Sequence, residues 1–329
     1  MSNAELERWR RQAESRMRKR VSLSGDISQD EIDILFITSS LPSTPDLSER
    51  RWRQMRANVL SEVQAEPRRH ANDDRGPLVD ELWSAIQRDE LVLFYQPKAD
   101  FQTGQVDEVE ALVRWRHPRH GLLLPGGFLA LAEQSGSIEP LDRWVLNTAV
   151  PQAIAWQGAG LDLGVSVNLA AHNLQRPDLP EIVEKLLATS GITPAQLVVE
   201  FTERAIIAGP GQAIENLRNL RTLGVRLSLD DFAATESSPA YLKRLPVDEI
   251  KIDRWLVLAM ASDKDEVAVV RSSIALGHEL GLKVVAEGVE DASTWERLAD
   301  WGCDIAQGNY LTRPIPASAL TRWMTDRAS

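Results

Sequence analysis

The sequence predicts an α/β fold, a (β/α)8 TIM-like barrel preceded by an N-terminal helical extension. From residue 77 onward, short apolar runs rich in β-branched residues alternate with segments of helical periodicity. Gly224, Gly281 and Gly302 each stand between a helical segment and the next apolar run, where helices commonly end in glycine. The 253 residues from 77 to 329 also match the usual size of a barrel of eight strand–helix units.

Residues 1–76 form the predicted extension, in which we find no chemistry. Apolar residues at helical spacing predict a helix over residues 1–20 and a second one after residue 50; they are Leu6, Trp9, Ala13 and Met17, then Trp52, Met55, Val59 and Val63. Two prolines and several hydroxyl residues predict a linker over 38–46, and another loop is expected over 66–76. The first helix is expected to pack either on a protein partner or on the main domain, so residues 1–76 are a possible place for a partner to bind.

The barrel domain is expected over residues 77–329. Its strands are predicted to end near Gln96, Arg114, Asn168, Glu203, Asp231, Asp253, Glu287 and Gln307. Helices are predicted between most of them, over 141–157, 211–223, 264–280 and 291–301. An open doubly wound sheet is the alternative, but the glycine-rich phosphate loop typical of such sheets does not follow the first strand.

The charge and composition of the chain exclude several classes of protein. The net charge is −11, and the barrel segment alone carries 23 Lys and Arg against 35 Asp and Glu, which argues against a polymeric nucleic acid as partner. A divalent metal would still allow a phosphate compound to bind. Cys303 is the single cysteine, so neither an internal disulfide nor a cysteine-based zinc site is expected. No apolar run has the roughly 20 residues of a membrane span, and a cytoplasmic location is expected.

Polar residues end most of the apolar runs. They are Glu110, Asn168, Glu200, Asp230, Asp231, Lys251, Asp253, Glu287 and Gln307. Burying a carboxylate is costly unless it is paired or binds a cation, so the two explanations are a salt-bridged barrel rim and a metal site. In a barrel these strand ends meet at the mouth where active sites form. We favour the metal site because the residues lie on successive strands.

The donor types indicate which metal and which chemistry. Oxygen ligands without histidine or cysteine favour Mg²⁺ or Mn²⁺, and the carboxylates suffice for two ions. Because neighbours on a strand point to opposite faces, Asp231 is expected where the strand turns into its loop. Lys251 and Asp253 share a face, and the lysine could orient a water molecule or offset phosphate charge. The sequence therefore predicts metal-dependent phosphoester chemistry.

Two other motifs are interpreted structurally. His117 and His120 flank Pro118, which predicts an exposed turn and not a metal site. Ser237-Ser238-Pro239 is typical of a helix N-cap followed by proline in the first turn.

From about Leu78 to the C-terminus, ordered motifs resemble the EAL domain, the cyclic di-GMP phosphodiesterase module of bacterial signalling. The first motifs are Phe94-Tyr95-Gln96-Pro97, Glu110-Ala111-Leu112-Val113-Arg114-Trp115, Ser166-Val167-Asn168-Leu169 and Glu200-Phe201-Thr202-Glu203. They are followed by Asp230-Asp231-Phe232, Tyr241-Leu242-Lys243-Arg244-Leu245-Pro246-Val247-Asp248, Lys251-Ile252-Asp253, Ala286-Glu287-Gly288-Val289-Glu290, Gln307-Gly308 and Arg313-Pro314. Together the motifs span about three quarters of the chain.

The resemblance implies a barrel that holds two Mg²⁺ or Mn²⁺ ions and opens cyclic di-GMP to linear pGpG. By resemblance, the ligands of the first ion are Glu110, Asn168, Glu200 and Asp230, Asp230 bridges to the second ion, and Asp231 completes that site. Lys251 would position the attacking water, and Glu287 would act in the network of water and metal. The nucleotide groove would be lined by Gln96, the Leu112 backbone, Arg114 and Pro314, with Asp253 and Gln307 near the metals.

One loop departs from the family pattern. The family usually has Asp-Asp-Phe-Gly-Thr-Gly-Tyr-Ser-Ser, whereas this chain has Ala233, Ala234, Thr235 and Glu236 after Phe232. Glu203, which resembles the residue that anchors this loop, is present. If a lost glycine normally has φ > 0, its replacement strains the loop by roughly 1 kcal/mol or more. An active phosphodiesterase, a nucleotide receptor with little turnover and a protein-interaction module are therefore all considered, each expected as a homodimer by analogy.

Overall fold

The computed structural model describes residues 75–233, 239–261 and 263–328. The chain divides into two compact units, Met1–Leu78 and Val79–Ser329, and the fold described here is that of the second. The helices predicted over 1–20 and after residue 50, with the linkers at 38–46 and 66–76, lie outside the described residues.

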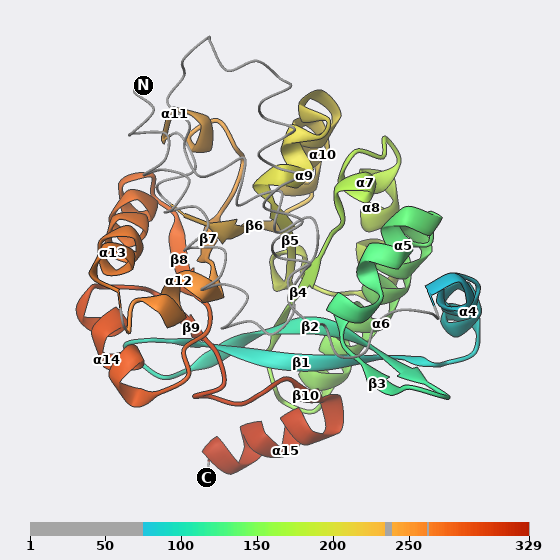
Figure 1. Ribbon diagram of the computed structural model, residues 1–329, viewed down its shortest axis with the longest axis horizontal. Coiled ribbons are helices and arrows are strands. Elements are labelled where there is room, and N and C mark those ends of the chain that lie inside the picture. The colour runs from blue at the N-terminus through green and yellow to red at the C-terminus, as the bar shows by residue number, and fades with distance from the viewer. Residues whose placement is uncertain (1–74, 234–238, 262, 329) are drawn as a thin grey trace, which may run out of the picture. The chain divides into compact units, whose positions relative to one another are not determined.

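Eight strands close into a barrel, which confirms the predicted fold class (Figure 1). Around the barrel, each strand pairs with the next in the order β1, β9, β8, β7, β6, β5, β4 and β2, and β2 pairs again with β1. Their bounds are Leu91–Asp100 (β1), Val106–His117 (β2), Gly164–Asn168 (β4), Leu197–Thr202 (β5), Arg226–Phe232 (β6), Glu249–Ile252 (β7), Lys283–Ala286 (β8) and Ile305–Gln307 (β9). Two short strands, β3 (Gly121–Leu123) and β10 (Ile315–Pro316), pair outside this ring.

Helices surround the barrel and connect its parallel strands. The longer ones are α4 (Arg75–Gln87), α6 (Ile138–Gly158), α8 (Leu179–Ser190), α10 (Pro210–Thr222), α13 (Lys264–Glu279), α14 (Ala292–Asp300) and α15 (Ala317–Ala328). The shorter ones are α5 (Leu129–Ser135), α7 (Ala171–Leu174), α9 (Glu203–Ile207), α11 (Pro239–Leu242) and α12 (Arg254–Ala259). The four predicted helices correspond to α6, α10, α13 and α14, so those predictions are confirmed within a few residues.

The prediction that every strand is followed by a helix is wrong at the start of the barrel. β1 runs antiparallel to both β2 and β9, and only residues 101–105 connect it to β2. A parallel neighbour needs a crossover of a dozen or more residues, whereas an antiparallel neighbour needs only a tight turn. The two strands are thus joined by a tight turn and not by a helix. The predicted strand ends near Gln96 and Arg114 are also wrong, because β1 continues to Asp100 and β2 continues to His117.

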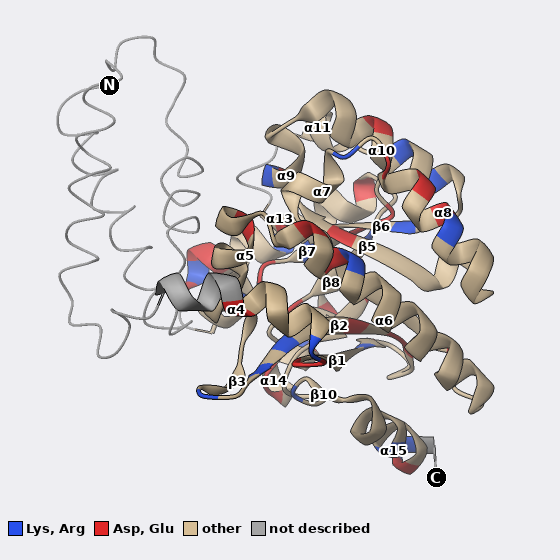
Figure 2. Cartoon of the chain, turned by 90° about the vertical axis from the view of Figure 1, so that its right-hand side faces the viewer, with Lys and Arg blue, Asp and Glu red and all other residues tan. Residues whose placement is uncertain are grey.

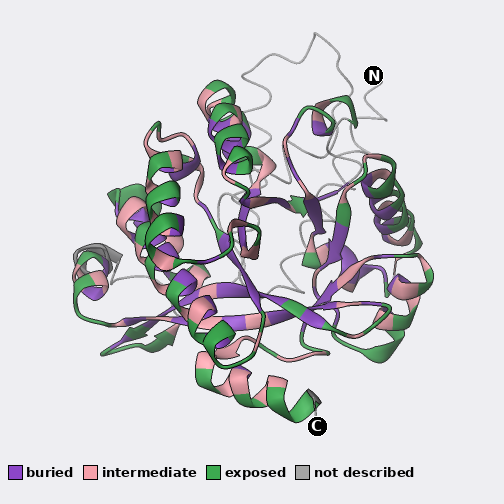
Figure 3. Ribbon diagram, turned by 180° about the vertical axis from the view of Figure 1, so that it is seen from behind, coloured by how far each residue is buried: buried purple, intermediate pink, exposed green. Residues whose placement is uncertain are grey.

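The buried residues lie mainly on the strands of the barrel and on the inner sides of the surrounding helices. Figure 2 shows acidic positions on the strands as well as on the outer helices, and Figure 3 shows buried strands inside helices that expose one side. Tyr95 and Trp156 pack edge to face with ring centres 4.8 Å apart, and the indole N–H of Trp156 donates to Thr321 Oγ1 at 3.0 Å. These contacts attach α6 and α15 to the outside of β1. Among the described helices, none is both long enough and apolar enough to cross a membrane.

Candidate active site

Lys251 lies at the centre of the site. It is fully buried on β7, and its Nζ lies 2.6 Å from Glu200 Oε2 and 2.5 Å from Glu287 Oε1. Asp230 Oδ1 and Glu110 Oε2 follow at 3.5 and 3.6 Å. Four carboxylates from β2, β5, β6 and the end of β8 therefore surround one ammonium. We call these five residues the carboxylate cluster.

Amide side chains extend the cluster toward β1. Asn168 Nδ2 donates to Glu110 Oε1 at 2.6 Å, and Gln307 Nε2 donates to the other oxygen of Glu110. Gln307 Nε2 also lies 3.2 Å from Gln96 Oε1, and Gln96 Nε2 donates to the Thr312 carbonyl at 3.1 Å. Gln96 and Glu110 meet because they are paired across the antiparallel strands. The predicted residues of these strands thus do come together, although Gln96 and Glu110 lie inside strands and not at their ends.

Burial and the nearby Lys251 ammonium shift the pKa values of the acids in opposite directions. Burial raises the pKa of Glu287 to about 8, although Lys251 opposes the shift. Burial also raises the pKa of Glu110 and of Asp230, against the effect of Lys251. Burial would likewise raise the pKa of Glu200, but Lys251 and Lys98 hold it well below its usual range. The surrounding carboxylates outweigh burial at Lys251 and raise its pKa, so this lysine is an ammonium donor and not a base.

A bulge in β6 places two adjacent aspartates opposite one residue of β7. Leu229 pairs with Ile250 and Phe232 pairs with Ile252, so Asp230 and Asp231 together face the single residue Lys251. Asp231 has φ = +56°, a left-handed conformation that aspartate tolerates better than most residues. Its N–H donates to Asp230 Oδ1 at 2.9 Å. The sequence places Asp231 at the turn into the loop, whereas in the structure the bulge inside β6 breaks the alternation.

The remaining predicted residues lie around this centre. Asp253 caps α12, where Oδ1 accepts from the Trp255 N–H at 2.8 Å. Arg114 donates to the Val113 carbonyl at 2.8 Å and lies over the ring of Phe94, the residue paired with Leu112. Glu203 begins α9, and Pro314 directly precedes β10.

The family model for the EAL domain matches residues 79–314. The chain belongs to the EAL domain family. This confirms the resemblance inferred from the motifs.

Named relatives and a solved structure agree with this assignment. The chain is 42% identical over 244 residues to the bifunctional diguanylate cyclase/cyclic di-GMP phosphodiesterase MucR of Pseudomonas aeruginosa, covering 74% of this chain and 36% of MucR. It is 41% identical over 246 residues to the cyclic di-GMP phosphodiesterase NbdA of the same organism, covering 74% of this chain and 31% of NbdA. The structure of the PaMucR phosphodiesterase in complex with c-di-GMP matches with 42% identity and a TM-score of 0.71, covering 74% of this chain and 99% of that one. This chain spans about a third of the length of the two curated relatives.

His117 of the EAL domain is buried, which corrects the prediction that both histidines lie in an exposed turn. His117 is the last residue of β2, and its ring packs against Trp115 with centres 4.7 Å apart. Its Nε2 lies 2.6 Å from Glu81 Oε2 on α4. His120 is exposed, as predicted. These contacts give His117 a structural role.

Sequence reasoning missed a second group of charges inside the EAL barrel. Lys98, Glu108, Arg226 and Glu249 lie at the end of the barrel where the parallel strands begin, and we call them the amino-end network. Lys98 Nζ lies 2.6 Å from Glu108 and 3.6 Å from Glu249, and Arg226 lies 2.6 Å from both acids. The available signal was strand alternation, since Lys98, Glu108 and Glu249 each stand two residues from a predicted site residue.

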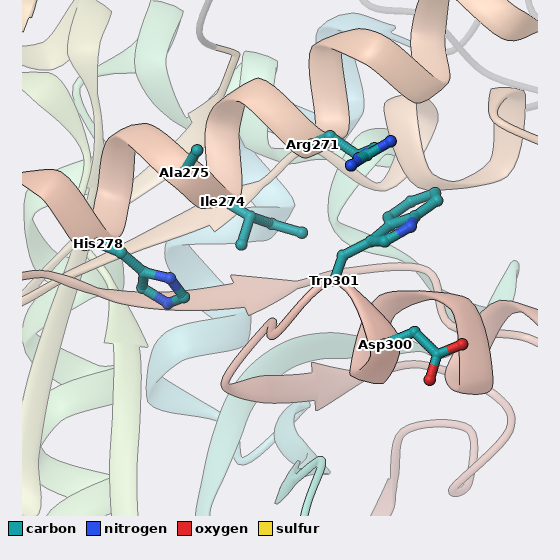
Figure 4. Close-up of a pocket in the computed structure, with 6 residues that line it drawn as sticks. All are labelled: Arg271, Ile274, Ala275, His278, Asp300 and Trp301. Carbon is teal, nitrogen blue, oxygen red and sulfur yellow. The ribbon is translucent and has the colours of Figure 1, made fainter.

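A cavity of about 370 Å³ lies outside the barrel, between α13 and α14 (Figure 4). It is lined by Arg271, Ile274, Ala275, His278, Asp300 and Trp301. None of these residues belongs to the carboxylate cluster, so the cavity contributes nothing to that site.

Proposed function

We propose that this EAL domain is a metal-dependent phosphodiesterase that hydrolyses cyclic di-GMP to linear pGpG. The observation that carries the proposal is the carboxylate cluster, in which four acids from different elements surround the ammonium of Lys251 within 3.6 Å. The relatives named as cyclic di-GMP phosphodiesterases, and the c-di-GMP complex of a 42% identical chain, support the substrate.

The charges of the cluster fit two divalent cations. Among the described residues, Lys251 is the ammonium that the carboxylates of Glu110, Glu200, Asp230 and Glu287 share, while Lys98, counted with the amino-end network, contacts only Glu200 of these four. With Asp231 beside them, the formal charge is −4 when all five acids are ionised, which two divalent cations would offset. Buried carboxylates without such compensation are costly.

The chemistry of the donors fits as well. All of them are oxygens, and Gln307 adds a buried Oε1 that accepts no hydrogen bond from the described residues. Mg²⁺ and Mn²⁺ prefer such oxygen ligands. Glu110, Asn168, Glu200 and Asp230 would hold one ion, and Asp230 with Asp231 would hold the second, with Asp253 nearby.

The residues of the chain supply the rest of the mechanism. When bound, a pair of divalent cations provides Lewis-acid chemistry for in-line phosphodiester cleavage. Lys251 stays protonated and donates a hydrogen bond that orients the attacking water, while Glu287 accepts from the same water. Gln96, the Leu112 backbone, Arg114 and Pro314 line the groove for the nucleotide. One water adds across one phosphodiester bond, so that the phosphate gains the hydroxyl and the 3′ oxygen gains the proton.

A hydrolysis assay tests this function. The full chain is incubated with cyclic di-GMP and Mn²⁺ or Mg²⁺, and pGpG is quantified by chromatography. Glu110→Ala, which removes one proposed ligand, is the control for contaminating activity. We expect pGpG from the wild type and none with excess EDTA. A wild type that forms no more pGpG than Glu110→Ala would overturn the proposal.

The altered loop motivates a second candidate, a cyclic di-GMP receptor with little or no turnover. Residues 234–238 lie outside the described residues. Among the described non-glycine residues, only Asp89 and Asp231 have positive φ, so Ala233 does not occupy the strained conformation that the lost glycine could have required. Calorimetry that shows micromolar binding, together with nucleotide that stays intact overnight, would select the receptor. A titration without heat would instead favour an interaction module.

Two assignments outside the site are proposed by analogy and from the sequence. The domain would form a homodimer, and residues 1–76 would be a helical extension that contacts a protein partner, separate from the barrel domain at 77–329. Sedimentation at tens of micromolar tests the first assignment, and a monomer would contradict it.

A further inference from the structure

Lys98 is placed by the antiparallel course of β1. Gln96 pairs with Glu110 and Lys98 pairs with Glu108, so two residues along β1 lead from the carboxylate cluster to the amino-end network. The side chains of Gln96 and Lys98 share a face because strand residues alternate. Lys98 is only 2% exposed, and its ammonium therefore lies inside the barrel.

Glu200 joins the two groups of charges. Its Oε1 accepts from Lys98 Nζ at 2.6 Å, and its Oε2 accepts from Lys251 Nζ at 2.6 Å. Each oxygen of this fully buried carboxylate thus has its own lysine, one on either side. Such contacts fix both the rotation of the carboxylate and the direction of each oxygen.

We propose that Lys98 is a positioning residue that holds Oε1 of Glu200 on the side of the amino-end network, so that only Oε2 points into the carboxylate cluster, where a divalent cation would bind. Glu200 then acts as a one-oxygen ligand, and Lys98 acts through Glu200 without touching substrate or metal. The inference rests on the proposed metal site and adds a residue to it.

The amino-end network is not proposed as a metal site. Oxygens of Glu108, Glu200 and Glu249 lie within 4.8 Å of one another, a spacing that could suit a metal. Lys98 contacts all three acids, and Arg226 pairs with Glu108 and Glu249. With two cations and two acids of its own, the network is neutral, in contrast to the carboxylate cluster.

Paired substitutions separate positioning from charge. Lys98→Met with Glu108→Gln removes one charge of each sign and the donor to Glu200 Oε1. Arg226→Met with Glu249→Gln also removes one charge of each sign from the network but leaves the contact between Lys98 and Glu200. Both full-length double variants are titrated with Mn²⁺ alone by calorimetry, and thermal melting checks that they fold.

We expect the first double variant to bind Mn²⁺ about 10-fold or more weakly, as is typical when the support of a metal ligand is lost. The second should bind within about 2-fold of the wild type, because its changes do not touch Glu200. Equal Mn²⁺ affinity in the first variant and the wild type would reject the role of Lys98, and so would equal losses in both variants. A wild type that binds no Mn²⁺ would overturn the proposed metal site together with this inference.

A second measurement uses the wild type and so does not depend on a variant that folds. In a crystal structure with Mn²⁺, Glu200 should bind the ion through Oε2 only, with Oε1 still on Lys98 Nζ. A carboxylate of Glu200 that binds through both oxygens, or that leaves Lys98, would overturn the inference.

Discussion

Asp142 makes the stability of the EAL domain depend on pH. This carboxylate on α6 is 8% exposed, and burial raises its pKa from 3.8 to about 7. Its Oδ2 accepts from the Ala170 N–H at 2.9 Å and from Asn173 Nδ2 at 2.7 Å. Both donors lie in the segment that follows Asn168, so Asp142 fixes the connection next to a proposed metal ligand.

The raised pKa of Asp142 determines whether the folded state gains or loses stability as the pH rises, and by how much. Between its unfolded pKa of 3.8 and its folded pKa of about 7, Asp142 holds a proton in the folded state that the unfolded chain has released. Its contribution to stability is therefore fully present below pH 3.8 and is lost as the pH rises through about 7. Integrating this linkage from pH 5 to pH 8 gives a loss of about 2.5 kcal/mol.

Asp142→Asn isolates this contribution. The amide oxygen of asparagine can accept both hydrogen bonds, and it does not titrate. Urea unfolding of both proteins at several pH values should show that the free-energy difference between them changes by about 2.5 kcal/mol from pH 5 to pH 8, with the wild type losing stability relative to the variant. Asp107→Asn, at an exposed position on β2, controls for the loss of one negative charge. A difference that stays constant with pH would refute the reasoning.

Three further predictions concern the site and its support. Lys251→Met should lower the hydrolysis rate about 100-fold or more while nucleotide affinity changes less than about 10-fold, since it removes the donor proposed to orient the water; an equal loss of affinity in calorimetry would contradict this. Mn²⁺ at a hundred times its Kd should raise the free energy of unfolding by about 2.7 kcal/mol, and EDTA should reverse it; a melting temperature that does not respond to Mn²⁺ would contradict the metal site. Gly308→Ala should cost about 2 kcal/mol or more in urea unfolding, because the added Cβ would overlap the backbone of Val289, whereas Gly126→Ala, which meets nothing within 4 Å, should cost little; equal stabilities would refute this contact.

Local signals predicted most of the barrel. Gly224, Gly281 and Gly302 all have positive φ after their helices, as expected from their place before the next strand. The antiparallel β1 was also within reach of the sequence, because residues 101–105 leave no room for a helix between two apolar runs. The prediction of eight equal strand–helix units did not take into account that the connection between the first two strands is too short for a helix.

The geometry of Asp230 and Asp231 was beyond local reasoning. Alternation along an isolated strand would direct the two side chains to opposite faces. The bulge arises from the register between β6 and β7, in which Asp230 and Asp231 lie opposite the single residue Lys251. Register between strands is a long-range property, and neither segment alone contains it.

The distinction between a metal site and a salt-bridged interior depends on partners and not on the number of acids. Glu108 and Glu110 stand two residues apart on β2, face the same interior and are both buried. Glu108 forms an ion pair with Arg226, which lies 118 residues later in the chain. Glu110 instead shares Lys251 with three other acids. The amino-end network is a salt-bridged interior, and the metal site stays a proposal for the carboxylate cluster at the opposite end of the barrel. Only the folded chain shows which acids have basic partners of their own and which share one lysine.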